Sequence, residues 1–250
     1  MEHSGTHIDA ISHQADHQKL AGGIDANAVA TAKGYLRGGV EEIDPIVARG
    51  VLIDVAKSKN MVSIRLLQAI GPHYAQDYIQ RFGFDPKMHP AYLTMALGAG
   101  SCTPLQLAAA YAVFANGGYR VKPWFISRVE DNRGGSLYAA KPETAGIDAE
   151  RVLDERNAFL MTMLMRDVVR YGTAAKAMSL GRNDLAGKTG TTNDHIDAWF
   201  AGYNGSLTAV SWIGFDTPAN LGKDETGSQA ALPIWMAYGS RVLKGVPETE

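Results

Sequence analysis

The sequence predicts an α+β protein in which helices precede an antiparallel sheet and a last helix covers that sheet. Apolar residues recur at helical spacing between residues 58 and 118. Three short runs that are expected to be strands follow at 185–192, 198–203 and 207–215, and a turn dipeptide, Asn-Gly, joins the last two. A proline then opens a final helical pattern, so helices and strands are expected in separate layers.

Three helices are expected in the first half of the chain. The first follows Ser58-Lys59-Asn60 and ends at Gly71-Pro72. The third has Thr103 as its N-cap with Pro104 at its first position, and Asn116-Gly117-Gly118 ends it. Apolar stripes at i,i+4 spacing predict the first two helices. The stripe of the first helix is Val62, Leu66 and Ile70, and the stripe of the second is Tyr74, Tyr78 and Phe82.

The middle of the chain changes from helical to strand periodicity. Apolar residues from Val121 to Val129 predict a strand, residues 131–135 form a turn, and Leu137-Tyr138 begins a returning strand. A long amphipathic helix is expected from about Asp154 to Tyr171.

Composition excludes several classes of protein. The 250 residues are 46% hydrophobic and 20% charged, which is ordinary for a globular domain. A net charge of -2 gives no reason to expect nucleic acid or an anionic membrane as a partner. The single cysteine, Cys102, excludes an internal disulfide and is expected to be buried or inert. We expect no transmembrane segment and no export signal, because no long apolar run is present.

Residues 1–50 differ from the rest and predict a poorly ordered leader. His3 and His7, and likewise His13 and His17, have the i,i+4 spacing of helical zinc ligands. No distant ligand closes such a site, so the prediction is that the chain binds no metal. Zinc binding by this leader is the alternative.

The most informative stretch is Ala186-Gly187-Lys188-Thr189-Gly190-Thr191-Thr192-Asn193, which reads as a strand. Lys188 supplies a cation, Thr189 and Thr191 supply hydroxyls, and Gly190 lets another backbone come close. A functional interpretation makes this a binding edge. The structural alternative is an exposed hairpin in which lysine protects against aggregation.

Together with Ser58-Lys59-Asn60, this stretch resembles the transpeptidase domain of class A (bifunctional) penicillin-binding proteins. The resemblance covers residues 51–245 and implies the penicillin-binding and serine β-lactamase-like fold, an antiparallel sheet packed by helices. Further phrases that fit the family are Ala96-Leu97-Gly98, Thr103-Pro104-Leu105, Phe114-Ala115-Asn116-Gly117-Gly118-Tyr119, Arg170-Tyr171-Gly172-Thr173-Ala174 and Ala231-Leu232-Pro233-Ile234-Trp235.

The resemblance implies D,D-transpeptidation, which is acyl transfer that crosslinks D-Ala-D-Ala stem peptides of peptidoglycan. It places Lys188 near the reacting serine and the substrate carboxylate, to which Thr189 and Thr191 donate. The peptide lies along the strand past Gly190, and the backbone N–H of Thr191 forms half of the oxyanion hole. The partners implied are stem peptides and β-lactams, no cofactor is implied, and the family works in the periplasm or on the outer face of the cytoplasmic membrane.

By the same resemblance, Ser58 relays a proton to the leaving amine, and Asn60 hydrogen-bonds the substrate amide and orients the catalytic lysine. Considered alone, both residues are equally typical of helix N-caps. His195, close to the motif, is interpreted as a loop residue. The aromatic side chains of the sheet are expected in the core: Trp199, Phe200, Tyr203, Trp212 and Phe215.

One element of the family pattern is missing from this sequence. None of its serines is followed three residues later by lysine, so the Ser-x-x-Lys nucleophile motif is absent. The family's first sheet strands are not recognised either, which predicts an N-terminally incomplete domain that is inactive on its own. The alternatives are a non-catalytic module that binds peptide or penicillin, and a relative of the serine β-lactamases.

Overall fold

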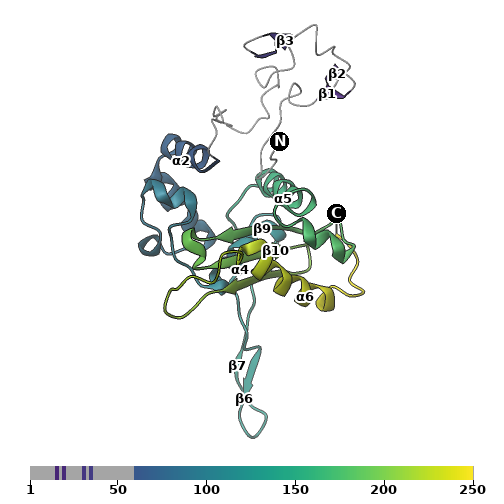
Figure 1. Cartoon of the computed structure of the whole chain (residues 1–250). Coiled ribbons are helices and arrows are strands. Elements are labelled where there is room, and N and C mark those ends of the chain that lie inside the picture. Colours follow the sequence, from purple (N-terminus) through teal and green to yellow (C-terminus); the bar gives the residue numbers. More distant parts are fainter. Residues whose placement is uncertain (1–14, 17–18, 21–29, 32–33, 36–58, 250) are drawn as a thin grey trace. The chain divides into compact units, whose positions relative to one another are not determined.

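A computed structural model describes residues 15–16, 19–20, 30–31, 34–35 and 59–249. The chain divides into two compact units, one formed by residues 6–62 and one that contains residues 63–250. We describe each unit separately (Figure 1). The predicted boundary near residue 50 remains a prediction.

The described part of the first unit consists of two small hairpins and the first residues of a helix. Strand β1 (Ala15–Asp16) pairs with β2 (Lys19–Leu20), and β3 (Ala30–Thr31) pairs with β4 (Gly34–Tyr35). Helix α2 (Lys59–Ile70) begins in this unit and continues into the second. The histidines of the leader lie outside the described residues.

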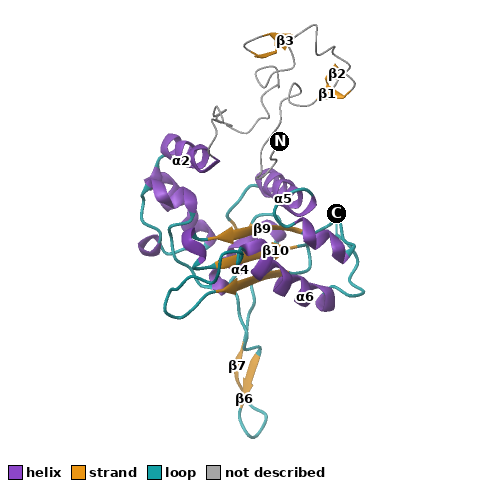
Figure 2. Ribbon diagram, in the orientation of Figure 1, coloured by secondary structure: helices purple, strands orange, loops and turns teal. Residues whose placement is uncertain are grey.

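The second unit contains the predicted α+β arrangement. Its sheet is antiparallel in the order β11-β10-β9, and Figure 2 shows these strands with helices around them. The strands are β9 (Ala186–Thr191), β10 (Ala198–Tyr203) and β11 (Thr208–Ile213), each within one of the three predicted runs. The remaining elements are α3 (Pro72–Ile79), η3 (Gln80–Phe82), η4 (Pro86–Met88), η5 (Leu93–Leu97), α4 (Pro104–Ala115), β5 (Tyr119–Arg120), β6 (Arg128–Glu130), β7 (Ser136–Ala139), β8 (Glu150–Arg151), α5 (Glu155–Arg170), η6 (Ala175–Leu180), η7 (Asn193–His195), η8 (Gly227–Ala231) and α6 (Leu232–Val242).

Helices pack on both faces of the sheet. Phe200 and Tyr203 are three positions apart on β10, so their side chains point to opposite faces. Phe200 lies in a buried cluster with Trp235 of α6 and with residues of η6 and η8. Tyr203 lies in a second cluster with Met165 of α5, against which Tyr111 of α4 packs. The core therefore fixes the sheet between α6 and α4, with α5 contributing to both clusters.

Helix termini follow the predicted signals. Thr103 caps α4 in a capping box, in which its hydroxyl accepts from Gln106 N at 3.2 Å and the Gln106 side chain accepts from Thr103 N at 2.8 Å. Asp154 caps α5 by accepting from Arg156 N at 3.0 Å. Both starts agree with the sequence because cap side chains satisfy backbone N–H groups that have no partner within the helix.

The strand expected from Val121 to Val129 is only partly correct. Regular pairing begins at Arg128, where β6 pairs with β7, and the preceding residues 121–127 form no strand. Pro123 cannot donate to a ladder, and Phe125 is 89% exposed, so little holds this segment in a sheet before Ser127, whose backbone oxygen accepts from Ala140 N at 2.9 Å. Figure 1 shows the β6–β7 hairpin extending away from the sheet.

The expectation that the aromatic side chains of the sheet all lie in the core is also only partly correct. Phe200 and Tyr203 are buried, but Trp212 is 39% exposed and Phe215 is 56% exposed. The ring of Trp212 is tilted by 35° relative to that of the half-buried Trp199, and their centroids lie 5.7 Å apart. Among the described helices, none combines the length and apolar character needed to cross a membrane.

Candidate active site on the outer strand

The Lys-Thr-Gly motif lies on an edge of the sheet. Strand β9 pairs with β10 alone within the described residues, with Thr191 opposite Ala198 and Lys188 opposite Ala201. An edge strand presents unpaired backbone N–H and C=O groups, to which a second extended chain can add. The motif is therefore placed where a peptide can pair with it.

Lys188 supplies positive charge at this edge. Its Nζ donates to the backbone oxygen of Thr189 at 2.8 Å, and no carboxylate among the described residues lies within ion-pair distance. Burial lowers the pKa of the Lys188 ammonium from its usual value. The side chain as a whole is nonetheless solvent-exposed, so water screens the charge of the ammonium.

Both motif hydroxyls have partners from outside the strand. The Thr189 and Thr173 hydroxyl oxygens lie 2.6 Å apart, and the backbone N–H of Gly227 donates to the Thr191 hydroxyl oxygen at 3.0 Å. A threonine hydroxyl carries one proton and two acceptor positions. Thr191 thus keeps its own proton free to donate, and the Thr173–Thr189 pair keeps one of its two protons, so this edge can still bind an anion.

Packing against the neighbouring strand also favours a glycine at position 190, in addition to the access that a second backbone needs. A Cβ atom at this position would come within 3.2 Å of Trp199 Cβ on the neighbouring strand. Gly227, at the start of η8, lies even closer to the motif, because a Cβ there would meet the backbone oxygens of Gly190 and Trp199 at 2.5 Å. Two glycines therefore let η8 press against β9 directly beside the two threonine hydroxyls.

A strained turn follows the motif strand. Asp194 and His195 have positive φ angles of 60° and 52°, which side-chain-bearing residues rarely adopt. Asp197 ties this turn down, since its backbone N–H donates to the Thr192 hydroxyl at 2.7 Å and its carboxylate accepts from Trp212 Nε1 at 2.8 Å. His195 is a loop residue, and its Nδ1 is buried without a hydrogen-bond partner among the described residues.

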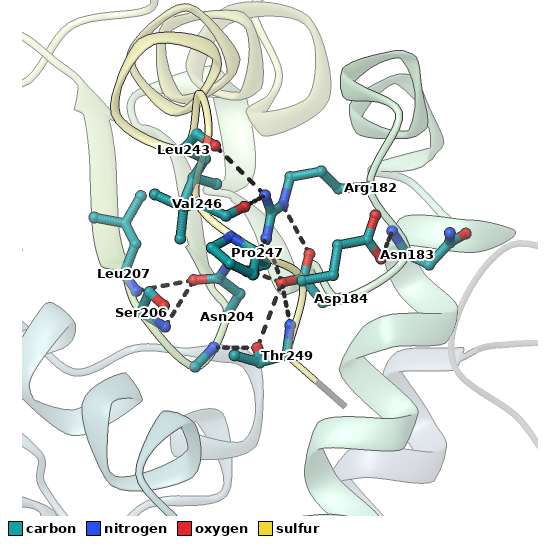
Figure 3. Close-up of polar contacts among 12 residues, drawn as sticks. Arg182, Asn183, Asp184, Asn204, Ser206, Leu207, Leu243, Val246, Pro247 and Thr249 are labelled. Carbon is teal, nitrogen blue, oxygen red and sulfur yellow. Dashed lines mark hydrogen bonds and ion pairs between the residues drawn. The ribbon is translucent and has the colours of Figure 1, made fainter.

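A buried ion pair anchors the start of β9 (Figure 3). Arg182 donates to Asp184 through two nitrogens at 2.9 and 2.6 Å, and Asn204, at the end of β10, donates to the same carboxylate at 2.9 Å. Arg182 also donates to the carbonyl oxygen of Val246 at 2.7 Å, and Thr249 N donates to Asp184 at 3.2 Å. This network joins β9, β10 and the C-terminal segment four residues before Lys188.

The pKa of Asp184 reflects this network. Burial disfavours its charge, but hydrogen bonds from Arg182, Thr249 and Asn204 outweigh burial and hold the pKa below its usual value. The carboxylate is thus ionised throughout the neutral range. A buried charge of this kind is tolerated because its oxygens are paired and hydrogen-bonded.

The other predicted wall of the site is only partly within the described structure. Ser58 lies outside the described residues, and Asn60 lies in the first turn of α2 with an exposed side chain. Asn60 belongs to the unit of residues 6–62 and Lys188 to the other unit, so their predicted proximity remains a prediction.

Residues that the sequence interpretation did not assign complete the described edge. Thr173 belongs to one of the family phrases but has no role assigned from the sequence, and no sequence signal near Gly227 predicts its contact with Thr191. Cys102 agrees with its interpretation, since it is half-buried and burial raises the pKa of its thiol. Within the part of the chain that the structure describes, no group of three metal-binding side chains comes together.

Comparison with known proteins identifies the family. The family model described as the penicillin-binding protein transpeptidase domain matches residues 51–231. The chain therefore belongs to the penicillin-binding protein transpeptidase family, and its α+β fold is that of the family. A second model, described as a putative cyclase, matches residues 1–82, so the sheet and its motif fall within the transpeptidase match alone.

Individual relatives agree with this assignment. The chain is 52% identical over 190 residues to penicillin-binding protein 1A of Neisseria lactamica, a match that covers 76% of this chain and 24% of the relative. It thus spans about a quarter of the length of that relative. It is also similar to the solved structure of penicillin-binding protein 1A from Haemophilus influenzae, with a TM-score of 0.73 and 33% identity over 77% of this chain and 34% of that one.

A more distant structure shares the same arrangement. The penicillin-binding protein PonA1 from Mycobacterium tuberculosis matches with a TM-score of 0.62 and 25% identity. That match covers 75% of this chain and 54% of PonA1. The fold around β9 is therefore shared with proteins far less similar in sequence than the relative that is 52% identical to this chain.

Proposed function

We propose that this chain carries the carboxylate-binding wall of a serine-type D,D-transpeptidase that crosslinks D-Ala-D-Ala stem peptides of peptidoglycan. The observation that carries the proposal is the outer strand β9, which, among the described residues, combines an open edge, a cation without a carboxylate partner and donor hydroxyls. Membership of the transpeptidase family supports the same substrate. No metal or organic cofactor is needed for acyl transfer of this kind.

The geometry suggests how a stem peptide binds. Its extended backbone adds to the free edge of β9, and its terminal carboxylate lies near the Lys188 ammonium and the hydroxyls of Thr189 and Thr191. The Thr191 N–H then serves as one donor of the oxyanion hole. Ser58 and Asn60 are proposed for the opposite wall, as proton relay and as substrate-amide donor.

Acylation is the step that this sequence does not provide. A covalent intermediate needs a nucleophilic serine and its base, and no Ser-x-x-Lys motif is present in the 250 residues. We therefore propose that the chain binds stem peptides and β-lactams reversibly. The active site of its relatives is expected in the periplasm or on the outer face of the cytoplasmic membrane, where peptidoglycan is built.

Intact-protein mass spectrometry after incubation with a penicillin tests the acylation proposal. We expect no added mass. A stoichiometric acyl adduct would overturn this account, and peptide mapping would then show which serine carries it, with Ser58 the first to inspect. Binding is tested separately by titrating a D-Ala-D-Ala peptide and the same peptide with a C-terminal amide. The free acid is expected to bind more tightly.

Two other functions are the alternatives. A non-catalytic peptide-binding module is favoured by the edge of β9 that is open among the described residues, and, like the chain as proposed here, it would bind the free-acid peptide without releasing D-alanine. A β-lactamase relative would hydrolyse a chromogenic β-lactam, which a chain without the nucleophile motif is not expected to do.

A further inference from the structure

We infer that Thr173, on the loop between α5 and η6, is a positioning residue that orients the Thr189 hydroxyl toward the carboxylate of the bound peptide. The inference rests on the proposed carboxylate-binding role of β9. The observation behind it is the 2.6 Å separation of the Thr173 and Thr189 hydroxyl oxygens, a short hydrogen bond between elements that are 16 residues apart.

The loop that carries Thr173 is held in one conformation. The backbone N–H groups of Gly172 and Ala174 both donate to the carbonyl oxygen of Val168, at 3.1 and 3.2 Å. Ala174 is fully buried, and a Cβ on Gly172 would meet Val168 backbone atoms at 2.9 Å. Glycine on one side and a buried alanine on the other therefore fix the position of Thr173.

Thr173 also lies where a ligand can approach. Its side chain is exposed and that of Thr189 is half-buried, so the shared hydrogen bond lies at the surface of the unit and not within its core. The Thr162 and Tyr203 hydroxyl oxygens form a contrasting pair, because they lie 2.9 Å apart and Tyr203 is buried.

The direction of the hydrogen bond follows from the charge of the ligand. A carboxylate near Thr189 accepts the Thr189 proton, so the Thr189 oxygen must accept from Thr173 instead of donating to it. The result is a chain of two bonds that point the same way, from Thr173 to Thr189 to the carboxylate. Hydrogen bonds aligned in this manner polarise one another. Without Thr173, the Thr189 hydroxyl loses both this polarisation and its fixed orientation.

Binding of a free-acid peptide and of its C-terminal amide tests the inference. The probes are N-acetylated D-Ala-D-Ala and its amide, titrated into the full chain, and the measured quantity is the ratio of the two dissociation constants. Thr173→Val keeps the shape of the side chain but removes the hydroxyl, and we expect it to reduce the preference for the acid by roughly two- to tenfold. Thr173→Ser keeps the hydroxyl and should restore the wild-type ratio.

Thr162→Val is the matched control. It removes the hydroxyl that pairs with Tyr203 by the same substitution, and it should lower the melting temperature without changing the acid-to-amide ratio. An unchanged ratio in Thr173→Val, with a wild-type protein that prefers the acid, overturns the inference and leaves the proposed function intact. A wild-type protein that binds acid and amide equally overturns the proposed function itself, and the inference with it.

Discussion

The backbone N–H of Gly227 donates to the hydroxyl oxygen of Thr191 at 3.0 Å, and this bond ties η8 to the outer strand of the sheet. The two residues are 36 positions apart. Because a backbone group makes the contact, the hydroxyl oxygen of Thr191 is held without using its proton. A separate close approach explains why η8 begins with a glycine, because a Cβ at Gly227 would meet the backbone oxygens of Gly190 and Trp199.

Replacing that glycine should disturb the motif strand. In Gly227→Ala the new Cβ would press on the backbone oxygens of Gly190 and Trp199 at 2.5 Å, and backbone cannot move aside as a side chain can. We expect a loss of about 1–3 kcal/mol in the free energy of unfolding, measured by urea denaturation. Gly190→Ala should lower the free energy of unfolding by less, because the closest contact of its new Cβ is a side-chain carbon at 3.2 Å. Equal stability of Gly227→Ala and wild type would contradict the close packing of η8 on β9.

Lys188 should contribute charge to peptide binding and little to stability. Lys188→Met keeps an unbranched apolar stem but removes the ammonium. We expect binding of the free-acid peptide to weaken by roughly two- to fivefold, with binding of the amide unchanged. Calorimetric titration of both peptides measures the difference. Lys176→Met, which removes a nearby cation from η6, is the control for a general loss of positive charge.

The lowered pKa of Lys188 also predicts a pH effect on stability. Because the pKa is lower in the folded protein, the unfolded chain binds more protons between the folded pKa and the usual lysine value. The free energy of unfolding should therefore gain a small increment as pH rises through that window, and Lys188→Met should lack it. Unfolding curves of the two proteins measured from neutral pH upward provide the comparison. Parallel pH profiles would show that Lys188 is not desolvated.

Asp184 should make the protein sensitive to acid. Asp184→Asn leaves the Arg182 guanidinium without its charge partner in a buried position, for an expected loss of about 3–5 kcal/mol in the free energy of unfolding. Since the folded pKa is lowered, this stability is present above the unfolded value of about 3.9 and is lost as pH falls through the folded pKa.

A surface ion pair provides the control for Asp184. Glu130 accepts from Arg128 at 3.0 Å, but both side chains are exposed. Glu130→Gln should change the free energy of unfolding by no more than about 1 kcal/mol. If Asp184→Asn and Glu130→Gln change the free energy of unfolding equally little in urea at pH 7, the buried network does not stabilise the start of β9.

Exposed apolar side chains predict dye binding and a broad melting transition. Phe159 on α5 is 62% exposed, and Leu160 and Met161 beside it are also exposed. Such a patch binds hydrophobic dyes when packing around it is incomplete. Phe159→Ser should lower dye fluorescence without lowering the melting temperature. A sharp two-state transition with no dye signal would contradict this expectation.

The sequence by itself determined the order of elements and most of their boundaries. Capping and turn residues act locally, so Thr103, Asp154 and Asn204-Gly205 were sufficient to predict where α4 and α5 begin and where β10 ends. It also predicted that Lys188, Thr189 and Thr191 lie together on one strand. It failed for residues 121–127, because apolar character there does not correspond to burial.

Only the tertiary structure decided what surrounds β9, the strand that carries Lys188, Thr189 and Thr191. Thr173 reaches Thr189 because α5 packs on β9, and Gly227 reaches Thr191 because η8 crosses the neighbouring strands. Periodicity cannot predict these contacts, because they depend on how distant elements pack and not on the order of residues within either one. The edge position of β9 was decided in the same way, since backbone pairing is a property of neighbouring strands.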